Sequence, residues 1–131
     1  MVTRFSLCFL LVGLLLSLGC TAQSNEPQRL PVSGSVSLDG KPLDKGVIYF
    51  KTVSKGSVDA LDIVAGKFSG EVEPGERRVE ISAFRTASGG TPGMDAGEVN
   101  YIPAKYNNKS TLKANVTQGQ ANEFDFAVTS K

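Results

Sequence analysis

The segment VSGSVSLDG at residues 32–40 decides the fold class, because apolar and polar side chains alternate along it with a period of two. Its valines and leucine fall on one side and its serines on the other, which is typical of a strand with one buried face. The Asp39-Gly40 dipeptide at its end tolerates positive φ at both positions and predicts a tight turn. The segment therefore predicts a strand that ends in a hairpin.

Six more segments carry strand patterns at short, regular spacing. GVIYF at 46–50 is apolar on both faces and predicts a central strand. The other five segments lie at residues 58–64, 67–72, 79–83, 112–117 and 124–128. Ala65-Gly66 and Pro74-Gly75 supply turn chemistry between them. The pattern predicts an all-β domain, a seven-stranded β-sandwich with Greek-key connections.

Composition argues against several function classes. The chain has 131 residues and contains no histidine and no tryptophan. Histidine is the usual general base near neutral pH and the most common metal ligand, so conventional hydrolase chemistry is not expected. The 14 basic and 13 acidic side chains balance, without the positive charge that nucleic-acid binding requires. We expect no enzymatic activity, no cofactor, no metal site and no nucleic-acid partner.

Residues 1–19 predict a signal peptide. Arg4 precedes an almost continuous apolar run at 5–18. Fourteen helical residues would span about 21 Å, less than the roughly 30 Å hydrocarbon core of a bilayer. That length favours an export signal over a membrane-spanning helix.

The end of this run, LSLGC at 16–20, resembles the lipobox of bacterial lipoproteins. Small Gly19 stands directly before Cys20, and the departure is Ser17, where the family usually has leucine. The resemblance implies cleavage before Cys20, a diacylglycerol on its thiol and a third acyl chain on its amino group, which together anchor stably. Ordinary cleavage nearby and an uncleaved anchor are the alternatives.

A lipid-modified Cys20 would place the protein in the cell envelope, with its domain facing the periplasm or the exterior. Residues 20–31 are polar and predict a flexible tether, which leaves 32–131 as the domain. Thr21 replaces the aspartate that resembles an inner-membrane retention signal, which favours the outer membrane. The expected partners are the membrane itself, envelope proteins and polysaccharide.

The domain resembles a known family. GSVSLDGKPL at 34–43 and GVIYF at 46–50 look like the opening of carboxypeptidase regulatory-like, or transthyretin-like, domains. GKF at 66–68 and Pro74-Gly75 match the middle of that family, and YIPAKYN at 101–107 is similar to the ending of small lipoproteins with this fold. These motifs are mostly turn chemistry, so they imply a prealbumin-like sandwich more strongly than a function.

The resemblance covers about residues 32–128 and has one clear departure. Glu76, Arg77 and Arg78 follow the Pro-Gly turn, where the family more often has an aromatic or small residue. Some transthyretin-like proteins are hydroxyisourate hydrolases with a histidine- and arginine-lined site. A chain without histidine does not fit that activity.

Most of the irregular chain lies between Phe84 and Ser110, and within it residues 86–98 have no core-forming period and are a candidate binding loop. Asp95 and Glu98 could supply oxygen donors to a ligand, with Tyr101 as a stacking surface. The alternative is a surface crossover without a ligand.

The next segment, YIPAKY at 101–106, adds Lys105 and Tyr106 as candidate interaction residues. The alternative is that its tyrosines and Ile102 cap one end of the domain while Pro103 fixes a turn.

Two pairs of carboxylates complete the candidate sites. Asp59 lies three residues before Asp62, and Glu71 lies two residues before Glu73. Calcium needs about six to eight oxygen ligands, and neither pair resembles a loop that supplies them. We expect these four side chains to be solvated charges on strands.

These observations favour a non-enzymatic cell-envelope lipoprotein that acts as a surface-tethered binding or structural module. The alternative is a carrier for a small ligand or carbohydrate that uses the region 86–109.

Overall fold

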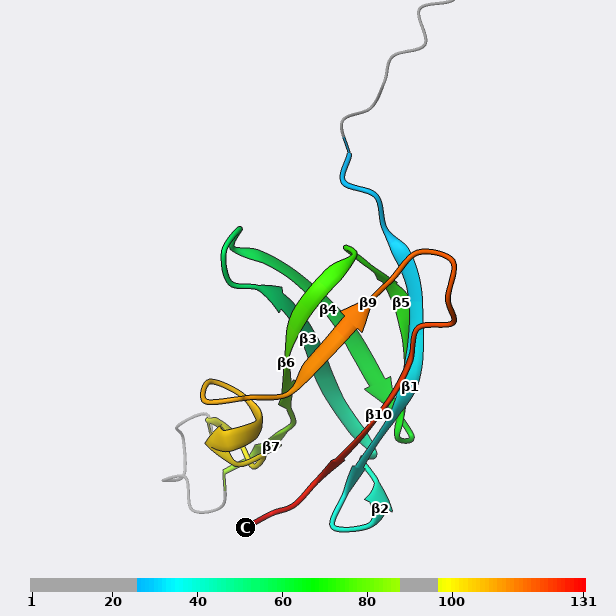
Figure 1. Ribbon diagram of the computed structural model, residues 1–131. Coiled ribbons are helices and arrows are strands. Elements are labelled where there is room, and N and C mark those ends of the chain that lie inside the picture. The colour runs from blue at the N-terminus through cyan, green and yellow to red at the C-terminus, as the bar shows by residue number, and fades with distance from the viewer. Residues whose placement is uncertain (1–25, 88–96) are drawn as a thin grey trace, which may run out of the picture.

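The computed structural model describes residues 26–87 and 97–131, where the chain is almost entirely β-structure (Figure 1). The elements in these ranges are β1 (Leu30–Leu38), β2 (Lys41–Pro42), β3 (Lys45–Thr52), β4 (Ser57–Val64), β5 (Lys67–Val72), β6 (Gly75–Ser82), β7 (Phe84–Thr86), β8 (Glu98–Asn100), the 3-10 helix η1 (Ala104–Tyr106), β9 (Lys113–Val116) and β10 (Glu123–Val128). The prediction of an all-β domain is confirmed.

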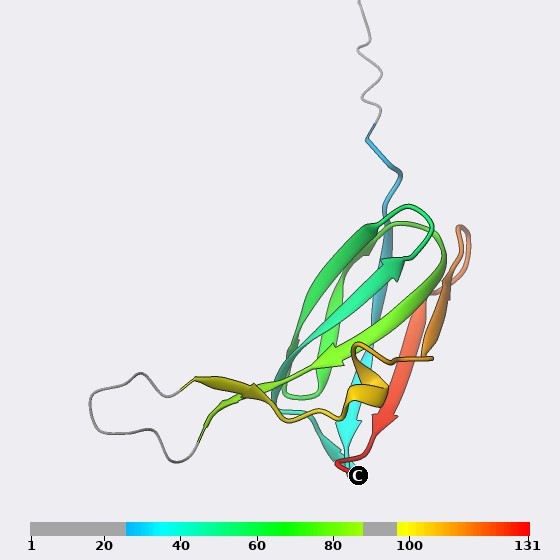
Figure 2. The same cartoon turned by 90° about the vertical axis from the view of Figure 1, so that its left-hand side faces the viewer.

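Most strands form one sheet that curls on itself (Figures 1 and 2). The strand order is β10-β1-β5-β4-β3-β6-β9, and the short β2 pairs with β1. Neighbouring strands are antiparallel except for β1 and β10, which are parallel. β4 and β5 share a single registered pair, Val64 with Lys67, beside their hairpin. β7 and β8 pair separately and extend away from the end of β6.

Each segment with a predicted strand pattern forms a strand, and β3 is central as GVIYF indicated. Along β1, Val32 and Val36 are buried while Ser33 is exposed, so the period of two holds. β1 begins at Leu30, two residues before the expected start of the domain, because Leu30 is itself buried in the core. The short strands β2, β7 and β8 were not expected, since two or three residues carry no readable period.

The core lies on the concave side of the curled sheet and is dominated by branched aliphatic side chains with an aromatic centre. Phe50 of β3 lies 6.1 Å from Phe68 of β5 and 6.5 Å from Phe124 of β10, measured between ring centroids. Phe126 stacks at 6.5 Å from both Phe68 and Phe124. Side chains from strands far apart in the sheet order therefore meet in one core, and aromatic pairs at these distances add to the stabilisation from apolar burial.

Two turns adopt the backbone conformation that hairpins require. Asp39 and Gly40 have φ of 51° and 80°, and Ala65 and Gly66 have φ of 49° and 75°. Two successive residues with positive φ are typical of the type I′ turn, whose twist matches that of the paired strands. The Ala65-Gly66 turn sets the register of β4 against β5, and the Asp39-Gly40 turn that of β1 against β2.

Gly34 allows β10 to approach β1. A Cβ atom at this position would lie 1.7 Å from the carbonyl oxygen of Phe124 and 2.7 Å from Cζ of Phe68. A backbone oxygen cannot move without disturbing the parallel pairing of these strands. A side chain at residue 34 is therefore incompatible with the position of β10.

We expect Gly34→Ala to lower the free energy of unfolding by about 3 kcal/mol or more, the upper range for overpacking a core. Urea denaturation followed by tyrosine fluorescence measures this loss. Gly97→Ala is the matched control, since a Cβ there meets no atom of the described residues within 4 Å, and a change within about 0.5 kcal/mol is expected. Equal stability of the two variants would contradict the proposed constraint.

Candidate functional site

The two ends of the curled sheet carry different features. The described chain begins at the end where β1 starts and where the β3–β4 turn, residues 53–56, also lies (Figures 1 and 2). We call this the entry end. The paired strands β7 and β8, the helix η1 and the C-terminus lie at the opposite end, which we call the distal end.

An ion pair is buried at the entry end. The side chain of Asp59 on β4 is 5% exposed and that of Arg77 on β6 is fully buried. Their closest atoms, Oδ2 and Nη1, are 3.0 Å apart. Arg77 also donates to the carbonyl oxygens of Glu73 at 2.8 Å and of Phe50 at 2.6 Å. Asp59 accepts a hydrogen bond from the Glu73 N–H at 3.0 Å and pairs with Arg29.

The prediction that Asp59 is a solvated charge is wrong. Alternation along β4 places Asp59 on the same side as the buried Ile63, and places Asp62 on the exposed side. Burial opposes ionisation of Asp59, but the Glu73 N–H and the charges of Arg29 and Arg77 outweigh burial and hold its pKa below the ordinary value. The ionised pair can therefore stay in the core because each charge is hydrogen-bonded.

We expect Asp59→Ala to lower the free energy of unfolding by about 3–5 kcal/mol, because it leaves the buried Arg77 charge without its carboxylate. Asp62→Ala, on the exposed side of the same strand, is the matched control and should change it by no more than about 0.5 kcal/mol. Chemical denaturation at neutral pH compares the two variants. A small effect of Asp59→Ala would show that the ion pair does not hold the sheet together.

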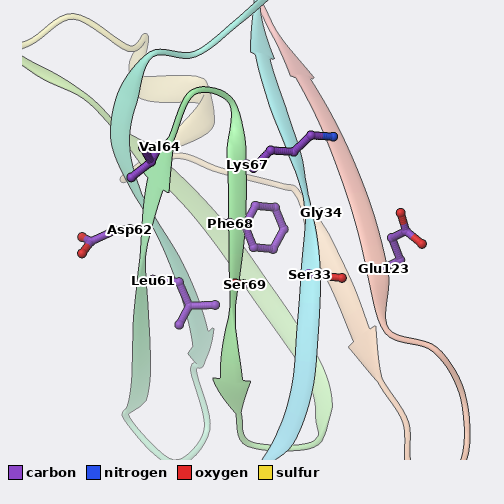
Figure 3. Close-up of a pocket in the computed structure, with 9 residues that line it drawn as sticks. All are labelled: Ser33, Gly34, Leu61, Asp62, Val64, Lys67, Phe68, Ser69 and Glu123. Carbon is purple, nitrogen blue, oxygen red and sulfur yellow. The ribbon is translucent and has the colours of Figure 1, made fainter.

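An open hollow of about 610 Å³ lies where β4 and β5 diverge (Figure 3). Its lining residues are Ser33 and Gly34 from β1, Leu61, Asp62 and Val64 from β4, Lys67, Phe68 and Ser69 from β5, and Glu123 from β10. Asp62 and Glu123 lie on opposite margins of the hollow, so its carboxylates do not converge on one point. This arrangement is more typical of a contact surface than of paired acid–base groups.

A second hollow, of about 360 Å³, lies on the other side of β4 at the distal end. Its lining is largely apolar and includes Val47, Ile63, Val64 and Phe84. Val64 is 61% exposed and Phe84 is 52% exposed. Large apolar side chains that gather at one exposed place are typical of a contact surface for another molecule. We call Val47, Val64 and Phe84 the distal apolar patch.

The predicted candidate residues that the structure describes form two groups. Glu98 and Tyr101 lie on or next to β8, whereas Lys105 and Tyr106 contact the C-terminal residues. Glu98 is exposed on β8, and the guanidinium carbon of Arg85 lies 5.7 Å from the centre of the Tyr101 ring. Ile102 is buried and Tyr101 packs against the core, so this segment caps the distal end as the alternative interpretation expected. Asp95 and Cys20 lie outside the described residues.

Lys105 and Tyr106 are engaged with the C-terminal residues of the chain. Nζ of Lys105 donates to the Lys131 carbonyl at 2.6 Å and lies 5.0 Å from the centre of the Tyr106 ring. The Tyr106 hydroxyl lies 3.1 Å from Oγ1 of Thr129, and this hydrogen bond lowers the pKa of Tyr106. The distal apolar patch was missed in the sequence, because a lone phenylalanine after a strand gives no signal of exposure.

Within residues 26–87 and 97–131, no cluster of three or more acidic or cysteine side chains could hold a metal ion. The described part of the chain also contains no helix long and apolar enough to cross a bilayer. Comparison with known proteins gives no match to any family model, curated protein or solved structure.

Proposed function

We propose that this chain is a lipid-anchored, non-enzymatic protein of the cell envelope whose β-domain acts as a tethered binding or structural module. One observation carries the proposal: the start of β1 and the distal apolar patch lie at opposite ends of the sheet. A domain attached through residues 20–29 to a lipid on Cys20 would present Val64 and Phe84 away from its point of attachment. That geometry suits contact with a second envelope component, either a protein or a polysaccharide.

We also infer that the domain is a seven-stranded Greek-key sandwich of the carboxypeptidase regulatory-like, transthyretin-like type. Two observations support this inference. The single registered pair between β4 and β5 separates the layer β10-β1-β5 from the layer β4-β3-β6-β9. Phe50 of the second layer packs against Phe68 and Phe124 of the first, as inner faces do in a sandwich.

The lipid anchor is tested by the intact mass and membrane partitioning of the natively expressed chain. We expect a mass that begins at residue 20 and includes acyl chains, together with retention in the membrane fraction. Cys20→Ala should be unprocessed or released, because the acyl chains need the thiol of Cys20. Cys8→Ala is the matched control and should behave as the wild type. An unmodified, soluble wild-type protein would refute the anchor.

The contact surface is tested by a photo-crosslinking amino acid placed at Phe84 and, as a control, at Val58. These residues are 52% and 53% exposed, so their side chains are equally accessible to solvent. We expect a discrete crosslinked species in intact cells from position 84, because Phe84 belongs to the distal apolar patch, and none from position 58. Equal labelling at both positions, or none at either, would contradict this surface.

A further inference from the structure

Three cationic side chains form a row across the outer face of the sheet. Lys51 of β3 is the registered partner of Arg78 of β6, and Arg78 is the registered partner of Lys113 of β9. The three strands lie side by side (Figure 1). Like charges directly opposite each other in a sheet are destabilising, so a row of three needs a compensating negative charge. We call these three residues the cationic row.

Two carboxylates compensate the cationic row in part. Glu80 accepts hydrogen bonds from Nζ of Lys51 and Nη2 of Arg78, both at 2.6 Å, and Glu76 accepts from Nζ of Lys113 at 2.9 Å. Three positive and two negative charges leave one positive charge. An ammonium has three donors and a guanidinium has five, so each cation keeps unused donors.

Arg78 is not fully hydrogen-bonded by these contacts. Its Nε is buried and has no hydrogen-bond partner among the residues that the structure describes. A buried N–H of a charged group without an acceptor costs free energy. The same holds for Nε of Arg77 in the core, and a buried Nε is closed to a ligand. The donors open to a ligand are therefore those at the part-exposed ends of Lys51, Arg78 and Lys113.

The cationic row borders a hollow of about 480 Å³ on the same face. The other residues that line it are Thr52, Val53, Ser54, Glu76, Ser110 and Thr111. The Ser110 hydroxyl already donates to the Val79 carbonyl, which leaves the other three hydroxyls as candidate donors. A cavity that combines ammonium, guanidinium and hydroxyl donors has the chemistry that recognises phosphate oxygens.

We propose that the cationic row and the hydroxyls beside it form a binding site for a phosphate-bearing group. The site is independent of the distal apolar patch and of the lipid anchor. Residues 51–54 lie toward the entry end, where the chain would approach the membrane. The phosphate can therefore belong to a lipid headgroup or to a soluble ligand, and both sources share the same chemistry.

The test is a titration of the full chain with inorganic phosphate, in neutral detergent and at constant ionic strength. Backbone amide shifts of Thr52, Ser54, Thr111 and Lys113 in NMR spectra report on the hollow. We expect saturable shifts at these amides in the wild type. Arg78→Gln should weaken binding by about tenfold or more, the loss expected for one hydrogen bond from a charged donor.

Two further variants keep the result interpretable. Lys113→Gln should also weaken binding, and because Lys113 is 65% exposed this substitution should leave the fold intact. Lys41→Gln removes an exposed lysine from β2, outside the hollow, and should bind as the wild type does. Absence of saturable shifts, or equal binding by all variants, would overturn the proposal.

The two sources of phosphate are distinguished by recording the same spectra in nanodiscs, first without and then with added inorganic phosphate. Shifts at the same amides in phosphatidylglycerol or phosphatidylcholine nanodiscs, relative to the spectra in phosphate-free neutral detergent, would identify a lipid headgroup as the ligand. Shifts that require added phosphate in both membranes would identify a soluble ligand. Either result supports the site and decides which molecule it serves.

Discussion

The buried ion pair between Asp59 and Arg77 is the interaction on which the curl of the sheet depends. Beyond the registered pair of Val64 and Lys67, β4 and β5 have no ladder to hold them together. Side-chain hydrogen bonds take the place of the missing ladder. Asp59 accepts a hydrogen bond from the Glu73 N–H, and Arg77 donates one to the Glu73 carbonyl. Side chains thus satisfy backbone groups at the end of β5 that would otherwise be buried without partners, which is costly. The desolvation of the two charges is offset in part, because Asp59 accepts from its neighbours and both Nη atoms of Arg77 are paired, although Nε of Arg77 has no partner among the described residues.

The curl set at the entry end brings remote parts of the chain into one core. β10 is the last strand in sequence and lies at one edge of the sheet, yet Phe124 packs against Phe50 of the central β3. This contact requires β10 to lie close to β1, and Gly34 provides the space because it has no Cβ. The ion pair and the glycine act at different places, but both determine whether the two halves of the sheet can meet over the same aromatic rings.

Alternation in the sequence predicted the strands well, because burial of one face leaves a period of two along each strand. The prediction failed for Asp59, which was expected in solvent and lies in the core beside Arg77. The signal was present: Arg77 is in phase with Val79 and Ile81. A charge in phase with apolar neighbours on one strand has to be paired, and its partner lay 18 residues away on another strand. Whether two such residues lie close together depends on the order of the strands in the sheet, and the alternation of apolar and polar residues carries no information about that order.

The charged residues 76–78 that follow the Pro74-Gly75 turn acquire a physical meaning from the same alternation. Arg77 and Arg78 are neighbours in sequence, but the pleat of β6 sends one into the core and the other to the outer face. The inward arginine fixes the register of β6, because its guanidinium has to reach Asp59 and two carbonyl oxygens. That register places Arg78 opposite Lys51 and Lys113. A slip by one residue would bury Arg78 and expose Arg77, so the constraint that stabilises the core also aligns the charges on the surface.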